Sequence, residues 1–137
     1  MLWPKRAAVR AIDTNIIVRL LANDDVEQVA RARHVMVSGE TFVALTVLLE
    51  AEWVLRSTYG LRSTEIIREL RSFVGVEGVR VEHPERLTRA FDWAEAGMDF
   101  ADALHLASAD DCDAFVSFDR PLAKVAASLS ALLVVEP

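Results

Sequence analysis

The feature that most constrains the fold is an alternation of short apolar segments with longer amphipathic ones along the 137 residues. Short apolar runs are typical of buried strands, and the longer segments between them are typical of helices. Strands that alternate with helices form mainly parallel sheets covered on both faces. We therefore predict an α/β fold, a three-layer α/β/α sandwich with a mainly parallel central sheet. The expected strands are residues 9–12, 41–44, 79–82, 114–118 and 132–135, and the expected helices are residues 16–21, 26–37, 46–59, 64–74, 84–96, 100–109 and 122–128.

The size and composition suit one soluble domain. The chain is 53% apolar and 26% charged, the balance of an ordinary globular protein, and no internal repeat or second boundary interrupts it. We therefore expect a single domain over residues 1–137. No apolar run approaches the roughly 18 residues of a membrane span. Pro4, Lys5 and Arg6 stand where a signal peptide needs its apolar stretch. We interpret residues 1–6 as a lead-in to the first strand and expect a cytoplasmic protein without a membrane partner.

Charge and cysteine content exclude some classes of protein. The 15 basic and 21 acidic residues give a net charge of −6, which argues against a simple polyanion-binding module. An acidic chain can still be an enzyme that holds divalent cations. The single cysteine, Cys112, excludes an internal disulfide and any zinc cage built from cysteines.

Two predicted strands end directly in an aspartate, at Asp13 and at Asp119. Ligands of open parallel sheets bind outside the carboxyl ends of the strands, so this placement favours a functional site. An aspartate after a strand can also simply cap the next helix. Both interpretations stay open for either residue alone, and the occurrence of two such residues favours function.

The predicted helix over 46–59 carries two acids of different character. Glu50 has only Thr46, Val47, Trp53 and Val54 three and four residues away, with no basic side chain among them. A carboxylate in such an apolar stripe is costly to bury without a compensating charge, which a cation could supply. Glu52 has Arg56 four residues on, so we assign Glu52 to an exposed surface ion pair.

A fourth acid comes from the helix over 100–109. Asp99, Asp102 and His105 recur every three residues and share a helix face. Asp99 fits the N-cap of this helix, and His105 fits a solvated face. Asp102 lies among small and apolar residues and is the better ligand candidate. We assign no role to the loop acids Asp110, Asp111 and Asp113.

Four segments together resemble the motifs of PIN domains, in the order in which that family has them. They are Ile12-Asp13-Thr14-Asn15, Leu48-Leu49-Glu50-Ala51-Glu52-Trp53-Val54-Leu55, Asp99-Phe100-Ala101-Asp102-Ala103-Leu104-His105 and Val116-Ser117-Phe118-Asp119-Arg120. The resemblance runs from about residue 9 to residue 135, and it is greatest to the stand-alone bacterial members that act as VapC-type toxins.

The resemblance implies an endoribonuclease that depends on Mg²⁺ or Mn²⁺, forms a homodimer and is inhibited by a cognate antitoxin. Its acidic quartet falls on Asp13, Glu50, Asp102 and Asp119 as catalytic and metal-binding residues. Thr14, Asn15 and Ser117 fall on positions that orient substrate or water. Many members have threonine where this chain has Ser117, and both side chains offer a hydroxyl.

Oxygen ligands without convergent histidine or cysteine suit Mg²⁺ and Mn²⁺ rather than zinc. Such an ion can activate water and stabilise charge on the departing oxygen of a phosphodiester. Candidate phosphate contacts are Arg19, Arg56, Arg62 and Arg120, although a plain solvated role is open for each. The sequence does not identify the RNA target.

Two other functions stay open. An aspartyl-phosphate phosphatase would have a second acid two residues after the first, but that position is Asn15. A PIN-like binding or scaffold module without catalysis would not need the complete acidic quartet. Binding of divalent metal distinguishes the nuclease from the scaffold.

Overall fold

The computed structural model describes residues 8–129 and 131–137. The lead-in that we inferred for residues 1–6 lies outside these ranges. The chain divides into two compact units, residues 1–82 and residues 83–137, and each is described by itself. The single domain over residues 1–137 stays a prediction.

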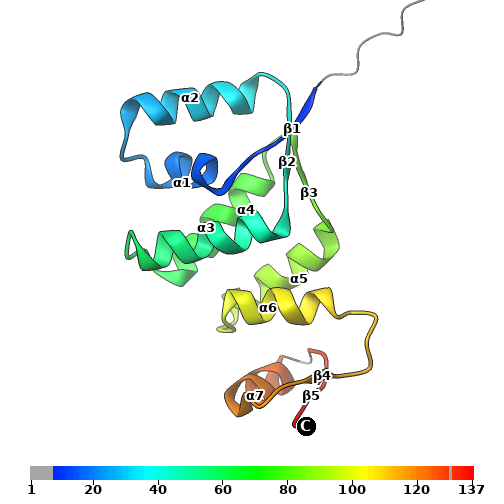
Figure 1. Cartoon of the computed structure of the whole chain (residues 1–137). Coiled ribbons are helices and arrows are strands. Elements are labelled where there is room, and N and C mark those ends of the chain that lie inside the picture. Colours follow the sequence, from blue (N-terminus) through cyan, green and yellow to red (C-terminus); the bar gives the residue numbers. More distant parts are fainter. Residues whose placement is uncertain (1–7, 130) are drawn as a thin grey trace, which may run out of the picture. The chain divides into compact units, whose positions relative to one another are not determined.

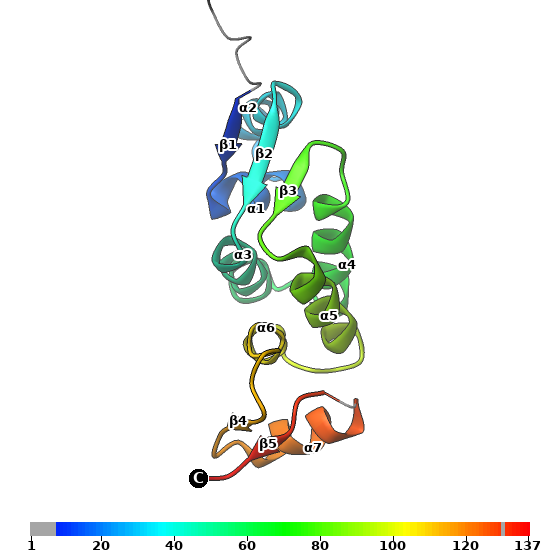
Figure 2. The same ribbon diagram turned by 90° about the vertical axis from the view of Figure 1, so that its right-hand side faces the viewer.

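The first unit is a three-stranded parallel sheet with four helices (Figures 1 and 2). Its strands are β1 (Val9–Ala11), β2 (Glu40–Val43) and β3 (Val79–Val81), and its helices are α1 (Thr14–Ala22), α2 (Val26–Val37), α3 (Leu45–Ser57) and α4 (Ser63–Val74). The strand order is β1-β2-β3, and the register pairs Val9 with Glu40 and Thr41 with Val79. Parallel crossovers are almost always right-handed, so two successive crossovers in one direction put their helices on the same side of the sheet, as Figure 1 shows.

The core of the first unit comes from the apolar faces of these helices and from the middle strand. Its fully buried side chains include Ile17, Val43, Leu48, Leu55, Ile66 and Leu70. Each such side chain contributes roughly 1.5–3 kcal/mol relative to an exposed one. This packing fixes the rotation of α1 and α3 and therefore the direction of their polar side chains.

The acids of α3 correct an expectation from the sequence. Glu52, expected at the surface, is 3% exposed, whereas Glu50, expected in a buried stripe, is exposed. The buried face consists of Leu48, Ala51, Glu52 and Leu55, which recur at helical spacing. The predicted ion pair is nevertheless present, because Arg56 Nε lies 3.0 Å from Glu52 Oε1. Glu50 therefore needs no cation to compensate burial.

Within the described residues, the second unit contains three helices and a small two-stranded parallel sheet. Its elements are α5 (Pro84–Glu95), α6 (Phe100–Ser108), β4 (Phe115–Val116), α7 (Arg120–Ser128) and β5 (Val134–Val135). The Phe91 and Phe100 rings stack between α5 and α6 with their centroids 5.6 Å apart. Gly97 makes the turn between these helices at a φ of +113°, a conformation that side chains with a Cβ rarely adopt.

The α/β class and the parallel pairing of strands are confirmed. Asp99 caps α6 as predicted, through a bond from the Asp102 amide, and Asp25 caps α2 through a bond from the Gln28 amide. Ser63 directly precedes the helix expected over 64–74 and fits its N-cap, but Arg62 is the N-cap residue of α4 and Ser63 is its first helical residue. Among the described residues, no helix is long and apolar enough to cross a membrane.

Candidate active site

Asp13 lies between β1 and α1, at the carboxyl end of the strand. It is the N-cap residue of α1, and its Oδ1 accepts a hydrogen bond from the Thr14 amide at 2.7 Å. The capping role that the sequence left open is therefore real. Asp13 is also exposed, so its carboxylate is accessible to a ligand.

Glu50 comes from the third helix and meets the start of the first one. The Thr14 hydroxyl donates a hydrogen bond to Glu50 Oε1. Thr14 itself is only 7% exposed, so its hydroxyl is held in place by the surrounding packing. Asp13, Thr14 and Glu50 line one pocket of about 340 Å³, together with Asn15 and Arg19. Two of the four predicted carboxylates are thus brought together within the first unit.

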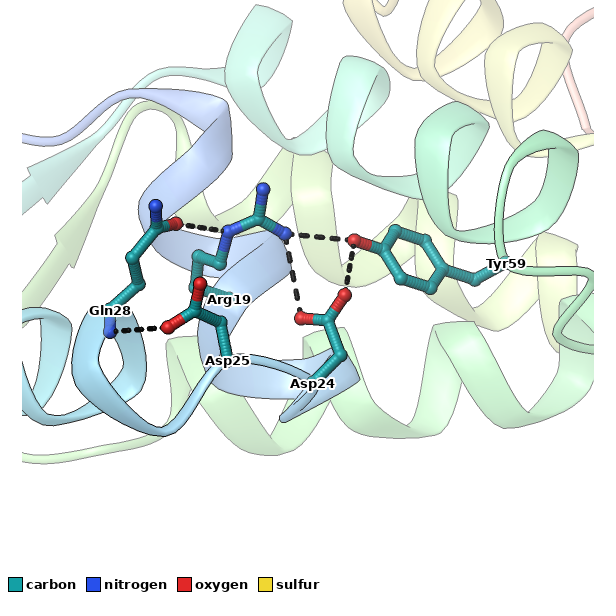
Figure 3. Close-up of polar contacts among 5 residues, drawn as sticks. All are labelled: Arg19, Asp24, Asp25, Gln28 and Tyr59. Atoms are coloured by element: carbon teal, nitrogen blue, oxygen red, sulfur yellow. Dashed lines mark hydrogen bonds and ion pairs between the residues drawn. The ribbon is translucent and has the colours of Figure 1, made fainter.

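A polar network holds Arg19 at the edge of this pocket (Figure 3). Arg19 Nη1 donates to the Tyr59 hydroxyl at 2.8 Å, and Arg19 Nε donates to Gln28 Oε1 at 2.5 Å. Asp24 completes the network, because it accepts from the Tyr59 hydroxyl at 3.0 Å and pairs with Arg19 at 3.5 Å. The hydrogen bond that Arg19 donates to the Tyr59 hydroxyl is the main reason that the pKa of Arg19 is raised above its ordinary value. Arg19 therefore stays a cation with a restricted geometry.

The other two predicted carboxylates lie together in the second unit. Asp102 is in the first turn of α6, and Asp119 is the N-cap residue of α7, where its Oδ1 accepts from the Leu122 amide at 2.9 Å. Both line a pocket of about 180 Å³, with Asp99 as a third acid in the lining. This pair repeats the arrangement in the first unit, with one acid at a helix N-cap and one within another helix.

The carboxyl of Asp102 has a raised pKa. Partial burial of the group is the main cause, and the negative charges of Asp99 and Asp119 add to it, while His105 acts in the opposite direction. Burial and like charges both disfavour the ionised form. A nearby cation would reverse this effect, which is what a metal ligand in this position requires.

Ser117 is half-buried at the end of β4, and its hydroxyl oxygen accepts a hydrogen bond from the Asp119 amide at 3.0 Å. The hydroxyl thus fixes the backbone that carries Asp119. Asn15 is exposed and lines the pocket of Asp13. Of the three residues predicted to orient substrate or water, Thr14 and Ser117 contact a predicted carboxylate residue directly.

The quartet is therefore found as two pairs, Asp13 with Glu50 and Asp102 with Asp119, each in a pocket of its own unit. Among residues 8–129 and 131–137, no group of three or more histidine, cysteine, aspartate or glutamate side chains is arranged to hold a metal ion. A single centre formed by all four acids stays a prediction.

Sequence reasoning missed Tyr59 and Gln28. Tyr59 is the only tyrosine of the chain, and it is the last residue of the helix expected over 46–59. Its hydroxyl meets Arg19, which is 40 residues away in the sequence. No local pattern could have paired them, although a lone tyrosine at a helix end is a place to look for a hydrogen-bonded hydroxyl.

Comparison with known proteins places the chain in a family. A match to the PIN domain covers residues 11–128, and the chain belongs to the PIN-domain family. Among solved structures, it is similar to the sarcin–ricin loop-cleaving toxin VapC20 of Mycobacterium tuberculosis, at 19% identity and a TM-score of 0.41, over 95% of this chain and 100% of that one. No curated protein matches the chain.

Proposed function

We propose that the chain is a Mg²⁺- or Mn²⁺-dependent endoribonuclease that acts as the toxin of a type II toxin–antitoxin pair. The observation that carries this proposal is the position of the four acids. The PIN-domain match at residues 11–128 includes Asp13, Glu50, Asp102 and Asp119, and each unit brings two of them to a pocket.

The donors fit the proposed ions. The candidate ligands are carboxylate oxygens, which hard divalent cations prefer, and His105 acts on the Asp102 carboxyl. Asp13, Glu50, Asp102 and Asp119 would hold the metal. When bound, a divalent cation lowers the pKa of water and stabilises the charge that develops on a phosphodiester.

The chain's own residues have separate tasks in this proposal. Thr14 holds one oxygen of Glu50 and leaves the other free to bind. Asp13 and Asp119 each use one oxygen as a helix cap, so each retains a second oxygen for a ligand. Asn15 is exposed in the pocket and can donate or accept a hydrogen bond, which suits it to position substrate or water.

The proposed partners follow from the family and not from any contact in the structure. They are an RNA substrate, a cognate antitoxin and a second copy of the chain in a homodimer. VapC20 is a toxin that cleaves the sarcin–ricin loop, but its likeness to this chain does not assign that target here. We further propose that the protein works in the cytoplasm, where RNA is available.

The experiment that tests the proposal is cleavage of a pool of structured RNAs by the purified chain, with Mg²⁺, with Mn²⁺ and with chelator. We expect metal-dependent cleavage that falls at least about 100-fold in Asp102→Asn, since even residues behind metal ligands typically contribute 10- to 100-fold. Arg33→Ala, an exposed substitution outside both acid-lined pockets, serves as the matched control and keeps full activity.

Equal cleavage by the unaltered chain and by Asp102→Asn would reveal a contaminating nuclease and contradict the proposal. If neither cleaves and no Mn²⁺ binds, the catalytically silent scaffold becomes the better interpretation. Hydrolysis of a phosphomonoester without RNA cleavage would instead indicate the phosphatase.

A further inference from the structure

A second and larger groove lies on the first unit, between α1 and α2. Its volume is about 620 Å³, and its walls include Ile16 from α1 and Ala32 from α2. Asn15 and Arg19 line this groove and also line the pocket of Asp13 and Glu50. The groove and the acidic pocket therefore lie next to each other along α1.

The charge of the groove is opposite to that of the chain as a whole. The ionisable side chains that line it are Arg19, Arg31 and His34, and no aspartate or glutamate is among its lining residues. The chain itself has 21 acidic residues against 15 basic ones, so the charge of this lining is opposite in sign to the net charge. A concave surface with basic side chains attracts polyanions and concentrates them locally.

The two arginines differ in how they are held. Arg19 is fixed by Tyr59 and Gln28, and it keeps part of its charge paired with Asp24 (Figure 3). Arg31 is exposed on α2 and forms no ion pair or side-chain hydrogen bond with the part of the chain that the structure describes. Arg31 is thus available to an external anion, while Arg19 is positioned where the groove meets the acidic pocket.

We propose that the α1–α2 groove binds the backbone of single-stranded RNA next to the phosphodiester in the acidic pocket, with Arg31 and Arg19 contacting successive phosphates. This inference rests on the proposed nuclease function and extends it to the path of the substrate. Arginine suits the role because its planar guanidinium can contact phosphate oxygens in pairs. The aliphatic side chains of the walls, such as Ile16 and Val35, offer apolar surface that unpaired bases can contact.

The test is equilibrium binding of a fluorescein-labelled single-stranded oligoribonucleotide, measured by anisotropy in chelator over a series of salt concentrations. Chelator prevents metal-dependent cleavage, so this experiment does not depend on the nuclease activity. We compare Arg31→Ala with Arg33→Ala, which removes the same charge from the same helix outside the groove. Neither substitution disturbs the core, because both side chains are exposed.

We expect Arg31→Ala to raise Kd about 3- to 10-fold and to reduce the slope of log K against log salt by about 0.7, the value for one phosphate contact on a single strand. Arg33→Ala should change Kd less than about twofold and leave the slope unaltered. Arg31→Lys should recover part of the affinity, because it restores the charge without the planar fork.

Equal losses of RNA affinity in Arg31→Ala and Arg33→Ala would overturn the proposal. A protein segment would then be the better candidate for the ligand of the groove. Failure of the proposed function has a different signature, because RNA would then bind through Arg31 without being cleaved in Mg²⁺ or Mn²⁺. If the unaltered chain cleaves RNA but Arg31→Ala has no specific effect on binding, the nuclease function stands and only the proposed RNA path through the groove is contradicted.

Discussion

The two pairs of carboxylates are placed alike in their units, but their negative charges are compensated differently. In each unit one aspartate caps a helix, and the second acid comes from within another helix. Glu50 accepts a hydrogen bond from the Thr14 hydroxyl, and the cationic Arg19 lines the same pocket. Within the described residues the Asp102 carboxylate accepts no hydrogen bond, and Asp99 and Asp119 add negative charge beside it.

This difference indicates that the two halves of the proposed centre depend unequally on an external charge. The Asp13–Glu50 pair is stabilised by donors from its own unit, so it can keep its geometry without a cation. The Asp102–Asp119 pair combines partial burial with like charges, and both disfavour ionisation. A cation or a proton is needed to relieve that repulsion. Removal of metal and changes of pH should therefore affect the Asp102–Asp119 pair more than the Asp13–Glu50 pair.

Removal of the Thr14 hydroxyl tests the first half of the comparison and should have the largest effect. Thr14→Val is nearly isosteric but cannot hold Glu50, so we expect kcat/KM for RNA cleavage to fall about 10- to 100-fold, as for other groups that orient metal ligands. Thr14→Ser retains the hydroxyl and should retain most of the activity. Full activity in Thr14→Val would mean that Glu50 does not need this donor.

Neutralisation of Asp102 tests the Asp102–Asp119 pair through the thermal stability of the protein. In chelator at pH 7, Asp102→Asn should raise Tm by about 2 °C, because it removes a charge that burial and two acids disfavour. The matched change in the first unit, Glu50→Gln, should not raise Tm, since Glu50 is exposed and accepts a hydrogen bond.

The sign of the pH dependence follows from the raised pKa of Asp102. A carboxyl with a raised pKa in the folded state contributes stability below its unfolded value, near 3.8, and loses that contribution as pH rises through the folded value. The advantage of Asp102→Asn should therefore shrink as pH falls and disappear below 3.8, where the native aspartate is protonated in both the folded and the unfolded state. Thermal melts at several pH values measure this, and an advantage that persisted in acid would point to packing instead of charge.

Loss of the Tyr59 hydroxyl should have the smallest effect. Tyr59→Phe removes one donor–acceptor group from the network, while Arg19 keeps its bonds to Gln28 and Asp24. We expect the free energy of unfolding to fall by about 0.5–1.5 kcal/mol, the usual contribution of one hydrogen bond. Urea denaturation measures the change. A loss well above this range would show that Tyr59 organises the pocket more than its two hydrogen bonds suggest.

Local sequence was enough to predict most of the secondary structure. The strands near 9–12, 41–44 and 79–82 and all seven helices occur within a few residues of their expected positions. Asp99 was predicted as a cap because an N-cap needs only its own side chain and an amide two or three residues on. The strand expected over 114–118 is shorter, since only Phe115 and Val116 pair with β5. Strand length depends on a partner that local sequence does not reveal.

The sequence by itself therefore determined the α/β class, the order of elements and which carboxylates end strands or lie within helices. Only the tertiary structure decided which side of α3 is buried. It placed Glu52 in the core and left Glu50 exposed, because that choice depends on how α1 and α4 pack against α3. It also joined Thr14 to Glu50 and Arg19 to Tyr59, pairs separated by 36 and 40 residues. Periodicity reports which residues share a face, whereas contacts at such separations exist only after the chain has packed.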